Sequence, residues 1–179
     1  MNSSTDEKLM HLYQTNKGDE GTKALVILYK RYLRKMLVFF YFSFNNNYPK
    51  AQDFVQDLFM KIIEQGQTFN TSQSFNSWIY RIATNMCKNE YRNSSIRNGH
   101  LQNIFKEQCE IVEEQSSYNL MIKEAISKME QEQRALIVLR FKMQMSIKEI
   151  AVIYEVPEGT IKSRLFNATK SLTFIYNQI

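Results

Sequence analysis

An all-α fold is predicted for this 179-residue chain, as two small helical domains joined by a flexible linker. Only five Gly and two Pro are present, which favours helices over strands and tight turns. Apolar residues recur at the three-and-four spacing of amphipathic helices along much of the chain. Loop-forming residues dominate the tract at 93–100. We therefore expect domains at 1–93 and 118–179, with a linker at 94–117.

The amino-terminal domain is predicted to contain three amphipathic helices after a polar, loosely helical stretch at 1–18. The first covers 22–40 and ends before the tract at 45–49, because Asn favours turns and Pro cannot continue a helix. The second covers 51–65. The third covers 75–92 and follows a polar loop.

The polar faces of the second and third helices differ in charge. The second helix is the least basic part of this domain, and its polar face includes Asp53, Gln56 and Asp57, whereas Phe59 lies on its apolar side. The third helix has a basic polar face that is nearly free of acid. The residues that we assign to this face are Asn76, Tyr80, Arg81, Asn85, Lys88 and Arg92.

Two short helices near the carboxyl end form a helix-turn-helix pattern. Ser146 and Glu149 have the spacing of a capping box, Pro157 suits the first turn of the next helix, and the small Ala151 lies where the two helices pack closely. The outward face of the second helix presents Glu158, Thr160, Lys162, Ser163, Arg164 and Asn167. Such side chains contact base edges and phosphates, although a solvated polar face has a similar composition.

These segments resemble a known family in both halves of the chain. Residues 132–134, 139–141, 146–151 and 156–165 resemble region 4 of bacterial sigma factors of the extracytoplasmic-function (ECF) type. The run Pro-x-Gly-Thr-x-Lys-Ser-Arg at 157–164 is far more specific than a generic helix-turn-helix. Residues 51–59 and 75–85 are similar to regions 2.2, 2.3 and 2.4 of the same family.

The resemblance implies a sigma factor that binds core RNA polymerase and directs initiation at particular promoters. It implies that Asp53, Gln56 and Asp57 bind the clamp helices of the β′ subunit. It also implies that the sigma factor makes a separate contact with the β flap. Phe69 and Asn70, in the loop at 66–74, are the implied sites for a flipped base of the minus-ten element. The resemblance also implies an anti-sigma partner, often at the membrane.

The remaining implied DNA contacts come from two helices. The basic face of the helix at 75–92 is expected to hold minus-ten DNA through Tyr80, Arg81, Asn85, Lys88 and Arg92. The second helix of the helix-turn-helix is expected to read the minus-thirty-five element through Glu158, Thr160, Lys162, Ser163, Arg164 and Asn167.

The sequence departs from the family at three points, one of which is that the region 2.4 helix ends with fewer arginines than usual. Glu155 occupies a turn position often held by Gly, and a left-handed conformation there costs about 1 kcal/mol. Phe166 and Asn167 stand where family members usually carry His-Arg, which removes a cation from the DNA contact.

Other function classes have less support. A metal site from His11, His100, Cys87 and Cys109 lacks the spacing of metal ligands, and no other motif indicates a cofactor, a small-molecule substrate or catalysis. No apolar run is long enough for a membrane helix, so a cytoplasmic protein is expected. A net charge of +5 is compatible with a polyanion partner. The alternative reading is a stand-alone helix-turn-helix regulator of transcription.

Overall fold

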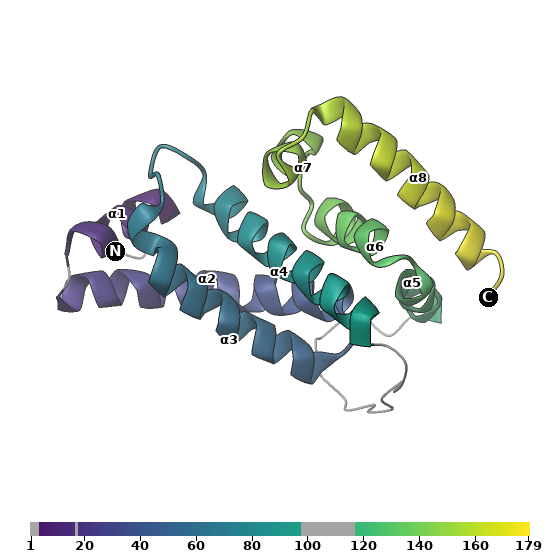
Figure 1. Ribbon diagram of the computed structural model, residues 1–179, viewed down its shortest axis with the longest axis horizontal. Helices are drawn as coiled ribbons and strands as arrows, with labels where there is room; N and C mark the ends of the chain where they lie inside the picture. Colours follow the sequence, from purple (N-terminus) through teal and green to yellow (C-terminus); the bar gives the residue numbers. More distant parts are fainter. Residues whose placement is uncertain (1–3, 17, 98–116) are drawn as a thin grey trace.

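The computed structural model describes residues 4–16, 18–97 and 117–179, and within these ranges all the regular structure is helical (Figure 1). The predicted all-α fold is therefore confirmed. The amino-terminal helices are α1 (Asp6–Thr15), α2 (Asp19–Ser43), α3 (Tyr48–Gln65) and α4 (Phe75–Arg97). The carboxy-terminal helices are α5 (Ser117–Lys128), α6 (Gln131–Ile137), α7 (Ile147–Tyr154) and α8 (Glu158–Tyr176).

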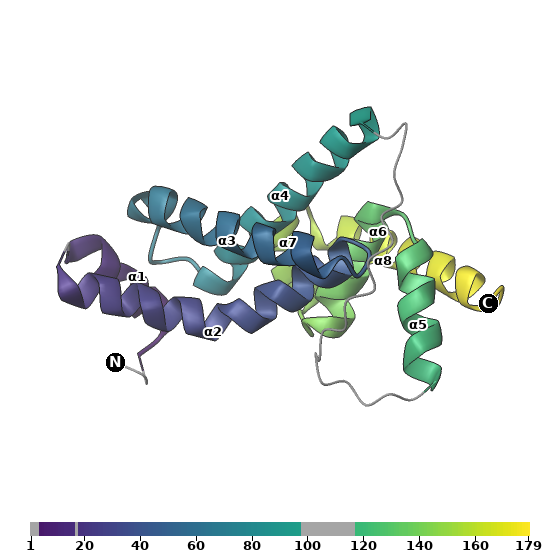
Figure 2. The same ribbon diagram turned by 90° about the horizontal axis from the view of Figure 1, so that it is seen from below.

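The described residues also contain two short helical turns. A 3₁₀ turn at Gly66–Thr68 follows α3, and a π-helical turn at Val138–Lys142 extends α6. In both Figure 1 and Figure 2, α1 and the end of α8 lie at opposite ends of the long axis of the molecule.

Most helix ends follow from local chemistry. The predicted break at 45–49 is confirmed: Asn45 and Asn46 have left-handed φ values of 61° and 62°, and the Asn47 side chain caps α3 through the Lys50 N–H at 3.0 Å. The polar stretch before residue 18 forms α1, which the sequence predicted only as loose helix. This helix is ordered because Leu9 and Met10 are buried against α2 and α4. Helix α4 ends at Arg97 rather than near Arg92.

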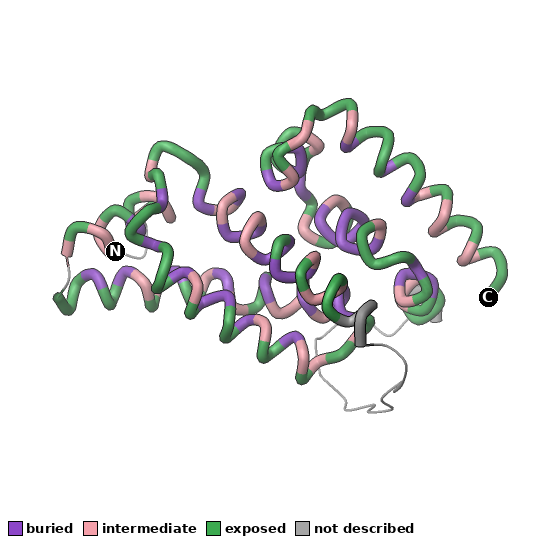
Figure 3. Tube along the Cα trace, in the orientation of Figure 1, coloured by how far each residue is buried: buried purple, intermediate pink, exposed green. Residues whose placement is uncertain are grey.

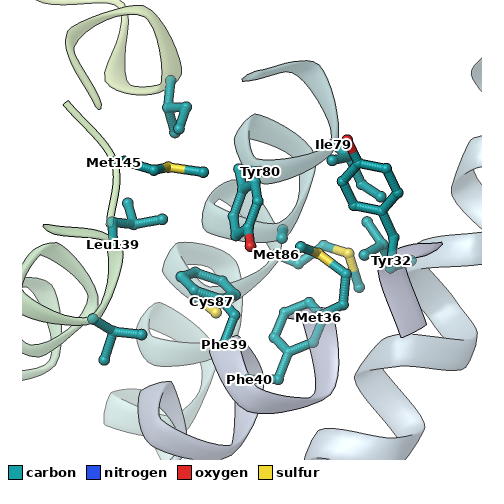
Figure 4. Close-up of a cluster of buried hydrophobic side chains, with 14 of the residues drawn as sticks. Tyr32, Met36, Phe39, Phe40, Ile79, Tyr80, Met86, Cys87, Leu139 and Met145 are labelled. Atoms are coloured by element: carbon teal, nitrogen blue, oxygen red, sulfur yellow. The ribbon is translucent and has the colours of Figure 1, made fainter. Parts of the chain in front are cut away.

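Buried residues line the inner sides of the helices, as Figure 3 shows, and one core extends through both halves of the chain. The central part of this core comes from α2 and α4, including Met36, Phe39 and Ile79. Leu139 and Met145, from the carboxy-terminal half, pack into the same cluster (Figure 4). A second, smaller cluster lies between α5, α6 and α8.

The two helical domains therefore pack directly against each other. Helix α7 contacts α4, and α6 with its π turn contacts α2. The sequence predicts two domains and a linker but says nothing of this contact, because the apolar stripe of each helix does not show which other helix covers it. Most of the expected linker, at 98–116, lies outside the described residues.

Candidate polymerase and nucleic-acid interfaces

The acidic residues of α3 lie in solvent, as predicted. Asp53, Gln56 and Asp57 are exposed, while the opposite side of α3 is buried against α2. Phe59 is 7% exposed and packs edge-on to Tyr29 with ring centroids 4.7 Å apart, which confirms its place in the core. Helix α3 thus separates a buried apolar side from a solvated acidic one.

Exposed apolar residues extend the acidic side of α3. Met60 and Ile63 are 56% and 45% exposed, one and two turns after Gln56. We refer to Asp53, Gln56, Asp57, Met60 and Ile63 as the acidic-apolar face. The sequence pattern gives no role to Met60, and the apolar spacing of α3 places Ile63 beside the buried Phe59 and Ile62. A large apolar side chain left in solvent beside charged residues is typical of a protein-binding surface.

The loop before α4 holds its two candidate residues differently. Asn70 is exposed, and its side-chain oxygen accepts the Ser72 N–H at 3.0 Å. Phe69 is only 5% exposed and packs against Phe75 and Trp78, with ring centroids 5.8 and 4.8 Å apart. Phe69 is therefore a core residue in this structure and presents no ring for a base to stack on.

Gln14 fixes the position of this loop, which the sequence does not predict. Its Nε2 donates to the carbonyl oxygens of Gly66 at 2.8 Å and Phe69 at 2.7 Å. Two backbone acceptors of the loop are thereby paired with one amide from α1. This contact could not be predicted from local sequence patterns, because Gln14 and the loop are more than fifty positions apart.

The basic face of α4 consists of Tyr80, Arg81, Asn85, Lys88 and Arg92. Asn85 and Arg92 are exposed, whereas Arg81 and Lys88 are half-buried. The placement of Tyr80 outside the core is wrong. Its side chain is 2% exposed, and burial raises its pKa above the ordinary value of a tyrosine. The carboxy-terminal domain covers this side of α4, which a single-helix pattern does not show.

A basic groove adjoins α4. Five cations line this groove of about 650 Å³, and no carboxylate in the described part of the chain lines it. They are Lys30, Arg31, Arg34, Lys35 and Lys142. Asn76, in the first turn of α4, also lines it, so the groove begins close to the loop that carries Asn70. The sequence does not predict this groove, because its cations come from α2 and from the distant π turn at Val138–Lys142.

The helix-turn-helix has the predicted geometry. Ser146 and Glu149 form the capping box of α7, and Glu155 ends α7 in the left-handed conformation at φ 55° and ψ 43°. The turn therefore has the left-handed residue at the helix end for which Gly is suited, and Glu155 adopts this conformation despite its strain.

Helix α8 presents the predicted face to solvent. Ile161, Leu165 and Ala168 are buried, and Thr160 is half-buried. The exposed members of the predicted set are Glu158, Lys162, Ser163, Arg164 and Asn167. Ser163 donates its hydroxyl to the Gly159 carbonyl at 3.1 Å, so within this helix it is already paired. Phe166 is 69% exposed.

Metal and membrane features are not found in the part of the chain that the structure describes. No group of three or more His, Cys, Asp or Glu residues there lies close enough to hold a metal ion. Cys87 is buried, and burial raises its pKa to about 12. His100 and Cys109 lie outside the described residues. None of the described helices is long and apolar enough to cross a membrane.

Comparison with known proteins identifies both halves. The profile of Sigma-70 region 2 matches residues 28–96, and that of Sigma-70 region 4 matches residues 119–172. The ECF RNA polymerase sigma-E factor of Escherichia coli (strain K12) is 31% identical over 185 aligned positions, covering 94% of this chain and 92% of the relative. The chain belongs to the ECF sigma factors. Region 2 is thus formed by α2–α4, and region 4 by α5–α8.

Further relatives agree with this assignment. The ECF sigma factor SigW of Bacillus subtilis (strain 168) is 24% identical and covers 89% of this chain and 91% of its own length. CnrH, solved with the cytosolic domain of CnrY, superposes with a TM-score of 0.71 at 18% identity, over 98% of this chain and 99% of its own. The sigma factor RpoE of Bartonella quintana, solved with the anti-sigma factor NepR, superposes with a TM-score of 0.63 at 24% identity. The superposition covers 84% of this chain and 96% of RpoE. These structures show that this ECF sigma factor shares its fold with them.

Proposed function

We propose that this ECF sigma factor binds core RNA polymerase through the acidic-apolar face of α3 and directs initiation at specific promoters. One observation carries the proposal: a single chain contains regions 2 and 4, and the acidic face of α3 and the polar face of α8 are both exposed to solvent. A stand-alone regulator has no use for an exposed acidic-apolar face on a second domain. The polymerase performs the chemistry, and the sigma factor selects the start site.

The acidic-apolar face suits a protein partner. Its apolar residues can be buried in a complex, while Asp53 and Asp57 can pair with cations on the clamp helices of the β′ subunit. Region 4 makes the second contact with the polymerase, at the β flap.

The DNA surfaces differ from the acidic-apolar face in charge. Asn70, Asn85 and Arg92 are exposed candidates for minus-ten DNA, together with four cations of the basic groove, Lys30, Arg34, Lys35 and Lys142. The fifth cation of the groove, Arg31, is half-buried and pairs with Asp6. Lys162, Arg164 and Asn167 on α8 are the exposed candidates for the minus-thirty-five element in the major groove. The two tasks are proposed for the two expected domains at 1–93 and 118–179, and α4 of the first continues to Arg97.

An anti-sigma factor is the proposed regulator, because a relative of the same fold was solved with one. We propose that it holds the chain in the cytoplasm or against the membrane when transcription is not needed.

The test of this function is co-elution of the purified chain with bacterial core RNA polymerase. We expect a stable complex, and Asp57→Ala should weaken it by about tenfold, or about 1.4 kcal/mol. Glu124→Gln is the control, because this exposed carboxylate on α5 lies outside the acidic-apolar face and pairs with Lys128 four residues away. Failure of the unaltered chain to bind core polymerase, with affinity for duplex DNA retained, would contradict the proposal.

A further inference from the structure

Part of the basic face of α4 is already in contact with another part of the same chain. Arg81 Nη1 lies 2.8 Å from Oε1 of Glu155, in the turn of the helix-turn-helix. The ammonium of Lys88 lies 4.7 Å from the ring centroid of Tyr154, the last residue of α7. Both cations therefore contact region 4 and are only half-exposed, although they are expected to hold phosphates.

The contact continues inward as a packed apolar layer. The hydroxyl of Tyr80 donates to the sulfur of Met143 at 3.0 Å. Figure 4 shows Tyr80 and Cys87 between the aromatic residues of α2 and the region 4 residues Leu139 and Met145. Leu139 and Met145 are 0% and 4% exposed. If the two regions separated, these side chains would enter water at an appreciable cost in free energy.

A third contact joins α2 to α6. Nη1 of Arg134, on α6, lies 3.4 Å from the carbonyl oxygen of Ser43, the last residue of α2. A helix end leaves its last carbonyls without partners inside the helix, and a cation there also meets the negative end of the helix dipole. Region 4 thus helps to cap a helix of region 2.

Glu155 connects this contact to the departure from the family pattern. Its left-handed backbone conformation favours glycine, and any other residue there is strained. Glycine has no carboxylate, however, and the carboxylate of Glu155 is the group that reaches Arg81. The strained residue at this turn therefore provides the ion pair between the two regions.

We propose that region 4 binds the α4 basic face within the same molecule. Residues 143–155 dock on it in the free sigma factor and leave it when promoter DNA is bound. The guanidinium of Arg81 cannot serve the Glu155 carboxylate and a phosphate in the same geometry, so docking and DNA binding at this face compete. The inference rests on the proposed function only where it names DNA as the competitor.

The docking itself is tested on the free, full-length chain by electron-electron double resonance. Spin labels are attached at Lys23→Cys and Lys170→Cys, two exposed positions in regions 2 and 4, in a Cys109→Ser background in which Cys87 stays buried. We expect a narrow distance distribution. Arg81→Glu with Lys88→Glu should broaden it, because two carboxylates then face Glu155 and Tyr154. Adding Glu155→Arg should narrow it again.

A broad distribution in the unaltered chain would overturn the docking, and so would an unchanged narrow distribution in the doubly substituted chain. The competition with DNA is tested separately, by fluorescence anisotropy with a labelled oligothymidylate of about 12 nucleotides. Glu155→Gln, which lies outside the proposed DNA contacts, should bind it about fivefold more tightly than Glu124→Gln. Both variants lose one carboxylate, so equal affinities would overturn the competition.

These outcomes are separate from the test of the proposed function. A narrow distribution that broadens as expected, in a chain that does not bind core polymerase, would support the docking and reject the sigma-factor role. A broad distribution in a chain that does bind core polymerase would do the reverse.

Discussion

Arg134 shows at the scale of one residue how the two regions are held in place. Its side chain is 6% exposed, and burial lowers its pKa from the ordinary value of an arginine. Besides Ser43, it donates to the carbonyl oxygens of Ile126, Ser127 and Met129, at 3.0, 2.8 and 2.7 Å. These acceptors lie at or just after the end of α5. One guanidinium therefore caps the ends of two helices.

Replacing Arg134 by lysine should destabilise the chain by about 2 kcal/mol, because an ammonium cannot reach all four carbonyls and leaves buried acceptors unpaired. Urea unfolding followed by circular dichroism measures this loss. Lys128→Gln, which removes an exposed cation of the same region, is the control and should change the free energy of unfolding by less than about 0.5 kcal/mol. Equal effects of the two substitutions would contradict the role given to Arg134.

Arg164 is the residue that most directly tests the reading of α8. It is exposed on α8, at the edge of the side that buries Ile161 and Leu165. If its guanidinium binds guanine through two hydrogen bonds, Arg164→Ala should weaken binding of duplex minus-thirty-five DNA by about 1–3 kcal/mol and leave core-polymerase binding unchanged. Asp57→Ala should have the opposite pattern. If both variants lose both activities equally, the assignment of the two surfaces is wrong.

At the scale of elements, helix α2 contributes the row of cations that the sequence left without a role. Lys30, Arg34 and Lys35 lie on the side of α2 that lines the basic groove. The affinity for single-stranded DNA falls as salt rises, so the slope of log affinity against log salt is negative. Changing all three residues to Gln should make this slope less steep by about 2, because each lost phosphate contact removes about 0.7.

The control for this slope is a triple change elsewhere. Lys61→Gln, Lys148→Gln and Lys170→Gln alter the net charge by the same amount on α3, α7 and α8. This control variant should change the steepness of the slope much less. The same slope in both triple variants would mean that the α2 cations act only through net charge.

Elements were predicted well where periodicity and caps are local. The helices at 51–65 and 75–92, the break at 45–49 and the capping box of α7 all follow from residues within a few positions of one another. Burial of Tyr80 and Phe69 could not be predicted in this way. Tyr80 is covered by residues more than fifty positions away, and Phe69 is held by the aromatic cluster at the start of α4.

The candidate site shows the same limit. Which side chains of α3 and α8 face solvent follows from their apolar stripes, and the structure agrees. The apolar members of the α3 face, the basic groove and the contact of Arg81 with Glu155 all depend on how helices pack against one another. A single sequence does not contain that information in its local pattern.

At the scale of the whole molecule, the shared core predicts a loss of stability in alkali. Burial raises the pKa of Cys87 from 9.0 to about 12, and it also raises the pKa of Tyr80, Tyr91 and Tyr154. Above pH 9 the unfolded thiol releases its proton while the folded one keeps it. The native state then binds more protons, so the free energy of unfolding falls as pH rises.

Between pH 9 and 10, Cys87 alone should contribute a fall approaching about 1.4 kcal/mol per pH unit, and the tyrosines should add to it above pH 10. Urea unfolding at several pH values measures this slope, and Cys87→Ala should show a shallower one over the first unit. The change in slope is the readout, since the cavity left by alanine lowers stability at every pH. Identical slopes in the two proteins would contradict the burial of the thiol.

The measurement that tests the central claim most directly is transcription from genomic DNA fragments by core polymerase with and without this chain, with the 5′ ends of the transcripts mapped. We predict start sites that appear only when the chain is added and that share two upstream sequence elements. Arg164→Ala should lose them in part. Transcripts no different from those of core polymerase alone, from a chain that still binds duplex DNA, would contradict the sigma-factor account.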